Sequence, residues 1–336
     1  MTIKDIAKEA GYAVGTVSRV LNNQPGVSDE ARKKVMEVVE KYHFRLNTNA
    51  KHLKQQNNTG IALIVKGRSN ILFAGFVERF QKLIEAKGYA SVLYYIDEEE
   101  HEVELAMQIC RERQPLGILF LGSNQENLKE SFSKVDIPCV LVTNPAAGLG
   151  FENLSSVCID DTHAAKTAIE FLISKGHEKI GIIGGEMSFS NPAKARYEGC
   201  LQAFKDKDIH FDPENQLATA SFTLEGGYRA MKQLIQNMPE ITAVFAMSDV
   251  TALGAIRAAK DCGRRIPEDM SVVGYDGIEM GQYVIPKLTT IKQPGEDIAY
   301  RCVEILMDCI HRNGKAVREI IPFSLIEGES TQVLSK

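Results

Sequence analysis

The chain has 336 residues, of which 44% are hydrophobic and 25% are charged, and its formal net charge is −5. This length suits about two domains with a small appendage. No stretch approaches the roughly 20 apolar residues that a membrane-spanning helix needs, so no membrane partner is expected. Acidic residues among the first ten positions exclude a typical signal peptide, and we expect a cytoplasmic protein.

Cysteine and histidine spacing gives no sign of disulfides or metals. The seven cysteines are odd in number and contain no CxxC pair, which favours free buried thiols in a reducing compartment. The seven histidines lack the spacing of a metal site, and His177, directly after Gly176, is predicted to lie at a helix end. Neither a metal nor another cofactor is therefore expected.

The first 22 residues predict two short helices joined by a tight turn. The first helix has the apolar stripe Ile3, Ile6, Ala7 and Ala10. Gly11 breaks this stripe. A second stripe follows at Val14, Val17, Val20 and Leu21. So short a connection is typical of a helix-turn-helix corner.

The opposite face of the second helix suits nucleic acid. It carries small or hydrogen-bonding residues, namely Gly15, Thr16, Ser18, Arg19 and Asn22. Such groups reach base edges and phosphates in a major groove. A third helix is predicted to begin after Ser28 as N-cap and to pack one side made of Val35, Val38, Val39 and Tyr42.

Charge distribution favours DNA binding over the alternative, in which the two helices form a purely structural corner. Residues 1 to 54 contain ten Lys or Arg and six Asp or Glu, so they carry +4 and the remaining 282 residues carry −9. A basic segment on an acidic body confines phosphate contacts to that segment. The overall acidity of the chain is thus compatible with DNA binding.

Several motifs resemble one family in order and spacing. TIKDIAKEAG, TVSRVLNN, VSDEARKKV and NTNAKHL are similar to the lactose and galactose repressor family of bacteria. The similarity continues through KGHEKIGIIGG, KARYEGC, AMSDVTALGAI, IPEDMSVVGYDG and LTTIKQP, and so covers nearly the whole chain. It implies a homodimeric transcription regulator, most often a repressor, that binds a palindromic operator and is controlled by a small effector such as a sugar.

Two residues depart from the family pattern in the N-terminal region. Ala13 stands where the family usually has a serine before the second helix, and losing such a cap costs about 1 kcal/mol. Leu46 replaces the usual proline before the linker, so the third helix is less sharply ended. Val14 and Gly15 occupy positions that set sequence preference in the family, which predicts an apolar contact at Val14 and little readout by Gly15.

Residues 47–59 form a predicted linker with helical spacing at Asn47, Ala50 and Leu53. A helix of two turns is unstable alone in water. The resemblance implies that two such segments of a dimer fold together in the minor groove, where Leu53 wedges between base steps. The full predicted DNA-contacting set is Ile3, Val14, Gly15, Thr16, Ser18, Arg19, Asn22, Asn47, Ala50 and Leu53.

The body predicts an α/β fold of two lobes. Nine short apolar runs alternate with helix-length stretches between residues 60 and 275, which favours parallel sheets flanked by helices. Gly88, Gly176 and Gly263 fall where helices should end. Residues 288–292 and 319–326 are predicted as strands that return to the body. The resemblance implies a type I periplasmic-binding-protein-like core.

The predicted domains follow from these patterns. Residues 1–46 form the helix-turn-helix domain, 47–59 the linker, and 60–336 the effector-binding and dimerisation core. We place one lobe near 60–160 with 292–320, and the other near 161–290 with 322–332.

Ligands of open α/β sheets bind beyond the carboxyl ends of the strands. The predicted strand ends carry Ser69, Asn70, Asn144, Asp160, Phe222, Ser248, Asp249, Asp276 and Gln293. With Phe73 nearby, these groups suit a polyhydroxylated or heteroaromatic ligand between the lobes. The resemblance places the effector arginine at Arg196 and the hydroxyl-binding aspartate at Asp276. The predicted effector set is Asn70, Phe73, Arg196, Phe222, Ser248 and Asp276.

Enzymatic function is disfavoured. GIIGGEM lacks the GxGxxG spacing, and the chain contains no P-loop and no GxSxG. No catalytic residue is therefore expected, although a Rossmann-type enzyme or ligand-binding module without DNA function stays the alternative. Asp161 is predicted to cap the following helix, and Glu98 to Glu100 to form a solvated loop.

Overall fold

The computed structural model describes residues 3–21, 26–42, 60–67, 70–185, 187, 190–312 and 314–334. The chain divides into two compact units, Met1–Asn57 and Asn58–Lys336. Asn22, Asn47, Ala50 and Leu53 lie outside the described residues, as do Leu46 and the linker, so these assignments stay predictions.

The first unit contains three helices, α1 (Ile3–Ala10), α2 (Val14–Leu21) and α3 (Asp29–Lys41). Gly11 ends α1 with a φ of +72°, a conformation that glycine adopts without strain. The three helices close on a small core of Ile6, Ala7, Ala10, Val17, Val20 and Val35. The predicted helix-turn-helix corner is therefore present, and Ile6, Ala7, Ala10, Val17 and Val20 of the two apolar stripes are buried.

Two residues of the predicted apolar sides of α2 and α3 are exposed. Val14 is 42% exposed and Tyr42 is 40% exposed. The Tyr42 hydroxyl donates a hydrogen bond to Glu9 Oε1 at 2.8 Å, so it ties α3 to α1 from the surface. The Ser28 cap is confirmed, because Ser28 Oγ accepts from the backbone N–H of Ala31.

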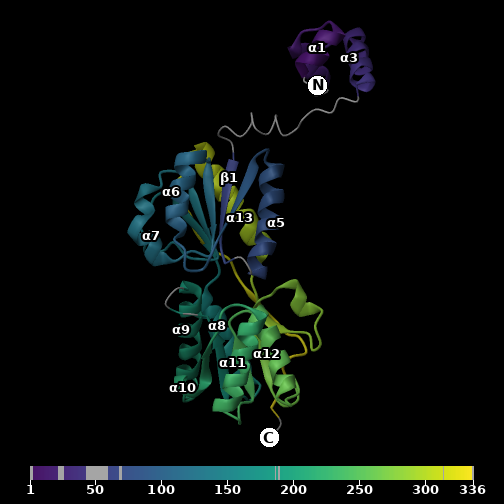
Figure 1. Ribbon diagram of the computed structural model, residues 1–336. Helices are drawn as coiled ribbons and strands as arrows, with labels where there is room; N and C mark the ends of the chain where they lie inside the picture. Colours follow the sequence, from purple (N-terminus) through teal and green to yellow (C-terminus); the bar gives the residue numbers. More distant parts are fainter. Residues whose placement is uncertain are drawn as a thin grey trace. The chain divides into compact units, whose positions relative to one another are not determined.

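The second unit contains two six-stranded sheets with helices on both faces (Figure 1). The first sheet has the order β11-β5-β4-β3-β1-β2, and all its strands are parallel. Its strands are β1 (Gly60–Lys66), β2 (Ala90–Ile96), β3 (Gly117–Leu121), β4 (Cys139–Val142), β5 (Leu154–Cys158) and β11 (Arg318–Ile320). Its helices are α5 (Ile71–Ala86), α6 (Glu102–Arg113), α7 (Gln125–Ser131) and α13 (Gly295–Arg312).

Alternation along β1 distributes apolar side chains to both faces of this sheet. Ile61 and Leu63 belong to the core that includes residues of α5 and α13. Ala62 and Ile64 belong to a separate core with residues of α6 and α7. A strand covered on both sides must be apolar throughout, which explains the unbroken hydrophobic run of β1.

The second sheet has the order β12-β10-β9-β8-β6-β7, and only β12 is antiparallel to its neighbour. Its strands are β6 (Ile180–Gly184), β7 (Leu217–Thr219), β8 (Ala243–Ala246), β9 (Ser271–Asp276), β10 (Thr289–Lys292) and β12 (Ser324–Ile326). Its helices are α8 (Asp161–Ser174), α9 (Asn191–Asp206), α10 (Pro213–Gln216), α11 (Leu224–Asn237) and α12 (Asp249–Asp261). The predicted α/β fold with mostly parallel sheets is confirmed.

The prediction of one strand over residues 319–326 is wrong. The segment forms two strands, β11 and β12, which pair with β5 in the first sheet and with β10 in the second. Pro322 lies between them, and proline cannot donate the hydrogen bond that a continuous ladder requires. The chain therefore passes from one sheet to the other at this point.

The predicted helix-ending glycines are confirmed, with φ of +84° at Gly88, +90° at Gly176 and +76° at Gly263. His177 follows α8 and is buried, where its ring contacts Thr242 Oγ1 and the carbonyl of Gln332. All seven cysteines are free thiols, but Cys262 is exposed rather than buried. In the part of the chain that the structure describes, no helix is long and apolar enough to cross a membrane.

Candidate functional site

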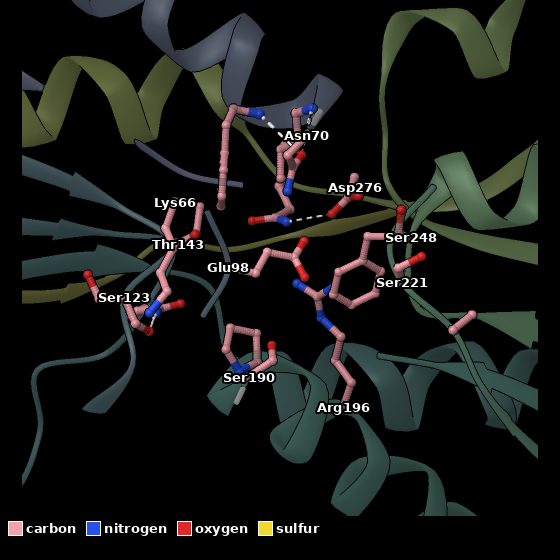
Figure 2. A pocket seen from close by; sticks show the side chains of 18 of the residues that line it. Lys66, Asn70, Glu98, Ser123, Thr143, Ser190, Arg196, Ser221, Ser248 and Asp276 are labelled. Carbon is pink, nitrogen blue, oxygen red and sulfur yellow. Dashed lines mark hydrogen bonds between the residues drawn. The ribbon is translucent and has the colours of Figure 1, made fainter. Parts of the chain in front are cut away.

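A cavity of about 480 Å³ lies at the carboxyl ends of strands from both sheets. Figure 2 shows the polar side chains that converge on it. From the first sheet and its helices come Lys66, Asn70, Leu72, Phe73, Glu98, Glu99, Gly122, Ser123, Thr143 and Asn144. From the second come Ser190, Pro192, Arg196, Thr219, Ala220, Ser221, Phe222, Ser248 and Asp276, and Gln293 follows β10.

The structure brings all six predicted effector residues to this one cavity: Asn70, Phe73, Arg196, Phe222, Ser248 and Asp276. Two of them also have a structural task. Asn70 Oδ1 accepts from the N–H groups of Leu72 and Phe73 and so caps α5, while Ser248 Oγ accepts from Val250 N and caps α12. Both residues are held rigidly at the cavity wall by helices that begin there.

Arg196 is only 6% exposed, and its charge is compensated inside the protein. Its Nε–H donates to Asp161 Oδ1 at 2.8 Å, and Nη1 donates to the carbonyl of Met247 at 2.6 Å. The guanidinium lies 3.8 Å above the centre of the Tyr275 ring. Burial disfavours the charged guanidinium, but Asp161 offsets this and the pKa of Arg196 is raised. The remaining donors of the fork are left for a ligand.

The predicted capping role of Asp161 is wrong. Asp160 is the cap of α8, because its Oδ1 accepts from His163 N at 2.9 Å. Asp161 lies inside the protein and accepts from Arg196 and from the Tyr275 hydroxyl, the latter at 2.6 Å. A pair of adjacent aspartates at a helix start gives no local signal of which one turns inward. Only the packing of α9 and β9 against α8 supplies the partners of Asp161.

Asp276 ends β9 in an unusual backbone conformation, with φ of +118°. Positive φ is strained for a residue with a side chain, and such strain is concentrated at functional sites. Gln293 Nε2 donates to Asp276 Oδ1 at 3.0 Å and holds the carboxyl in place. Burial raises the pKa of Asp276 to about 6, although Arg196 and Gln293 both favour its ionised form. Asp276 thus titrates close to neutral pH.

We predict that affinity for a neutral sugar falls on acidification through pH 6. In the predicted contact, ionised Asp276 would accept two ligand hydroxyls, and at pH 5 only about one tenth of it is ionised, which predicts roughly tenfold weaker binding. Calorimetric titration of the sugar from pH 5 to 8 measures this. Because its folded pKa lies above the unfolded value, Asp276 favours folding below pH 4 and loses that contribution as pH rises through 6. The loss of sugar affinity at acid pH therefore cannot come from unfolding caused by Asp276. A sugar affinity that does not change with pH would contradict the assignment of Asp276 as a ligand contact.

Lys66 enters the cavity at the end of β1 as half of a buried ion pair. Its Nζ lies 2.8 Å from Glu102 Oε2, and the two side chains are 9% and 1% exposed. Glu102 also accepts hydrogen bonds from Asn124 N and from Asn127 Nδ2. The carboxylate is therefore fully engaged, and the lysine is fixed at the wall. Neither residue was found from the sequence, because their pairing joins positions 36 apart.

Two buried polar atoms of the lining residues have no hydrogen-bond partner among the residues that the structure describes. Asn144 donates through Nδ2 to the Ser123 carbonyl at 2.5 Å, but its Oδ1 accepts nothing. Ser123 Oγ is likewise unpartnered. A buried polar group left unpaired costs about 1 to 3 kcal/mol, so such groups mark where a ligand or water supplies the missing bond. Asn144 is among the predicted strand-end residues, whereas Ser123 is not.

The other predicted strand-end residues lie in different surroundings. Gln293 lines the cavity, and Asp160 caps α8. Asp249 is fully buried beneath the site, where it accepts from Thr290 Oγ1 and Ile278 N. Burial raises the pKa of Asp249 well above its ordinary value. It supports the turn that follows Asp276, while Ser69 lies outside the described residues.

Glu98 and Glu99 belong to an exposed loop after β2, as expected, but they also line the cavity. The side chain of Glu98 points into the cavity (Figure 2). The sequence indicated only a solvated acidic run, because a loop residue carries no periodicity that shows where its side chain points.

The second candidate site is the exposed side of α2. Val14, Gly15 and Arg19 are exposed, while Thr16 and Ser18 are half-buried. Ile3 begins α1. Gly15 has no side chain, so this side of α2 can approach a DNA groove closely, and the exposed Arg19 lies one turn further along the helix. Readout by Thr16 and Ser18 stays a prediction.

The cavity lining offers hydrogen-bond donors and acceptors together with two phenylalanine rings. Among the described residues, no group of three or more His, Cys, Asp or Glu is placed to hold a metal ion. The lining residues that the structure describes include no cysteine and no histidine.

Two protein-family models match the chain. "Bacterial regulatory proteins, lacI family" matches residues 2–47, and "Periplasmic binding protein-like domain" matches residues 169–331. The transcriptional regulator MalR of Clostridium butyricum is 34% identical, over 98% of this chain and 99% of its own. The ribose operon repressor of Halalkalibacterium halodurans is 30% identical, over 98% and 97%.

Solved structures agree. The cellobiose complex of the transcriptional regulator CelR superposes with a TM-score of 0.73 at 27% identity, over 98% of this chain and 99% of its own. A lac repressor dimer bound to operator has the same fold, with a TM-score of 0.78 at 23% identity over 99% of each chain. The chain therefore belongs to the lacI family of bacterial regulatory proteins and is a DNA-binding transcriptional regulator rather than an enzyme.

Proposed function

We propose that the chain is a cytoplasmic homodimeric repressor whose affinity for a palindromic operator is set by a sugar bound in the cavity. The observation that carries this proposal is the convergence of Arg196, Asp276 and unpartnered Ser123 and Asn144 on one cavity beyond two parallel sheets. In the proposed organisation, residues 1–46 contact bases, 47–59 form the hinge and 60–336 bind effector and partner.

A sugar fits this cavity better than an apolar molecule. Its hydroxyls can bond to the Arg196 donors, to Asp276 and to the unpartnered polar atoms, while Phe73 and Phe222 offer apolar surface to the ring. Among the relatives, one is named a ribose operon repressor and one structure holds cellobiose. A heteroaromatic base is the second candidate, favoured by the same two phenylalanines. Thermal-shift screening with sugars and nucleobases separates the two.

A homodimer requires an exposed apolar surface, and the segment after β9 provides one. Met280, Tyr283 and Ile285 are 46%, 78% and 95% exposed. Apolar side chains exposed together mark protein interfaces. A twofold dimer also matches a palindrome, because each head then meets an identical half-site.

Control follows from two arrangements of the lobes. One hydrogen bond, from Gln125 N to Asn191 Oδ1 at 3.1 Å, joins the start of α7 in the first lobe with the start of α9 in the second. A ligand that prefers one arrangement shifts the population toward it. In the proposal that arrangement sets the spacing of the two hinge segments, and hence whether Ala50 and Leu53 reach the minor groove.

The operator contact is tested by Arg19→Ala. If Arg19 contacts a base edge, the substitution weakens specific binding by about 1 to 3 kcal/mol, or fivefold to more than a hundredfold. Fluorescence anisotropy on a palindromic operator and on a scrambled duplex measures both affinities. Lys33→Ala in α3, which also removes one exposed positive charge, is the matched control. An equal loss on both duplexes would limit Arg19 to a phosphate contact.

A further inference from the structure

We propose that the cavity selects uncharged sugars over phosphorylated ones, and that Glu98 enforces this selection. The inference rests on the proposed function and concerns the charge of the effector. It follows from three features of the lining: neutralised cations, occupied helix starts and an excess of acceptors.

Among the described lining residues, the two cations are already neutralised by buried carboxylates. Arg196 is paired with Asp161 at 2.8 Å, and Lys66 is paired with Glu102 at 2.8 Å. All four side chains are less than one tenth exposed. A phosphate would have to compete with both carboxylates, which cannot leave because each accepts further hydrogen bonds. Neither cation therefore provides free positive charge for an anion.

The helix starts at the cavity are also occupied. Free backbone N–H groups at a helix N-terminus bind phosphate readily. Here α5, α9 and α12 begin at residues that line the cavity. In each helix the side chain of the N-cap residue accepts a hydrogen bond from a backbone N–H of the first turn. Asn70 accepts from Leu72 N and Phe73 N, Ser190 from Ala193 N, and Ser248 from Val250 N. Some of the backbone N–H groups that a phosphate would bind therefore already donate hydrogen bonds within the protein.

The uncommitted groups are mainly acceptors. Glu98, Glu99 and Asp276 carry negative charge, and Asn144 Oδ1 is an unpartnered acceptor. Within the described ranges, no ion pair involves Glu98, Glu99 or Asp276. A sugar hydroxyl can donate to each of these oxygens. A phosphate monoester carries a charge near −2 at neutral pH and offers mainly acceptor oxygens, so it meets like charge at Glu98, Glu99 and Asp276, whose ionised oxygens cannot donate to it.

Glu98 is the residue that this argument singles out, because it reaches the cavity from an exposed loop and caps no helix (Figure 2). Asp276 and Asn144 are fixed by Gln293 and by the Ser123 carbonyl. Replacing Glu98 therefore changes the charge of the cavity without removing a support of the fold.

The test compares each sugar with its own phosphate ester on the full chain. Calorimetry and thermal shift are run at pH 7.5 with ribose and ribose 5-phosphate, glucose and glucose 6-phosphate, and trehalose and trehalose 6-phosphate. We expect a neutral sugar to bind at least tenfold more tightly than its ester. Glu98→Gln should strengthen binding of the ester, and the ratio of sugar affinity to ester affinity should therefore fall at least threefold. Glu130→Gln, an exposed carboxylate outside the cavity, should leave it unchanged.

The outcomes separate the two proposals. Tighter binding of an ester than of its parent sugar overturns the charge selection and leaves the sugar-controlled repressor intact. An unchanged ratio in Glu98→Gln overturns the assignment to Glu98. If no sugar or ester binds, the proposed function itself fails and the inference fails with it.

Discussion

Arg196→Ala is expected to abolish sugar binding while operator affinity without sugar stays within about twofold, because remote sites are energetically independent unless a ligand couples them. Among the described residues of the cavity lining, Arg196 is the only arginine, and hydrogen bonds from a charged donor are worth about 1.5 to 3 kcal/mol each. Calorimetry for the sugar and anisotropy for the operator measure the two effects. Asp276→Ala should behave in the same way.

Arg229→Ala is the matched control for Arg196→Ala. Arg229 also forms an ion pair, with Glu225 at 2.7 Å, but its side chain is 78% exposed and does not line the cavity. It should bind sugar, and its operator affinity should respond to sugar, as in the unmodified chain. If Arg196→Ala and Asp276→Ala respond to sugar as strongly as this control, the effector site lies elsewhere. If sugar changes operator affinity in none of the proteins, coupling between the sites is refuted.

Asp161→Leu is expected to lower the free energy of unfolding by about 3 to 5 kcal/mol. The substitution leaves the Arg196 charge buried without its partner, and the Tyr275 hydroxyl loses its acceptor. Urea denaturation followed by circular dichroism measures the change. Asp269→Leu, which breaks an ion pair between Asp269 and the exposed Arg265, should cost far less because exposed pairs contribute about 0 to 1 kcal/mol.

The double variant Asp161→Leu with Arg196→Met separates stability from ligand binding. It removes both charges together, and an apolar replacement of a buried pair is often neutral for stability. We expect it to recover most of the lost free energy of unfolding and yet to bind no sugar. Stability as low as that of Asp161→Leu alone would show that the loss comes from packing around Tyr275 rather than from an unpaired charge.

The sequence by itself determined the features that depend on neighbouring residues. Stripes at helical spacing located α1 and α2, and Ser28 marked the start of α3. Glycines marked the ends of helices, and unbroken apolar runs located the strands of the parallel sheets. These patterns are readable because helix and strand periodicity decide which side of a segment is buried. They also fixed the carboxyl ends of the strands, where the cavity lies.

Only the tertiary structure decided which side chains meet there. Arg196 and Asp161 are 35 positions apart, Lys66 and Glu102 are 36 apart, and nothing in either local segment identifies the other. Residues 319–326 were expected as one strand, yet they form two strands that serve two sheets. Partners of this kind depend on how helices and sheets pack, and burial then forces each charge to pair with whichever group that packing supplies.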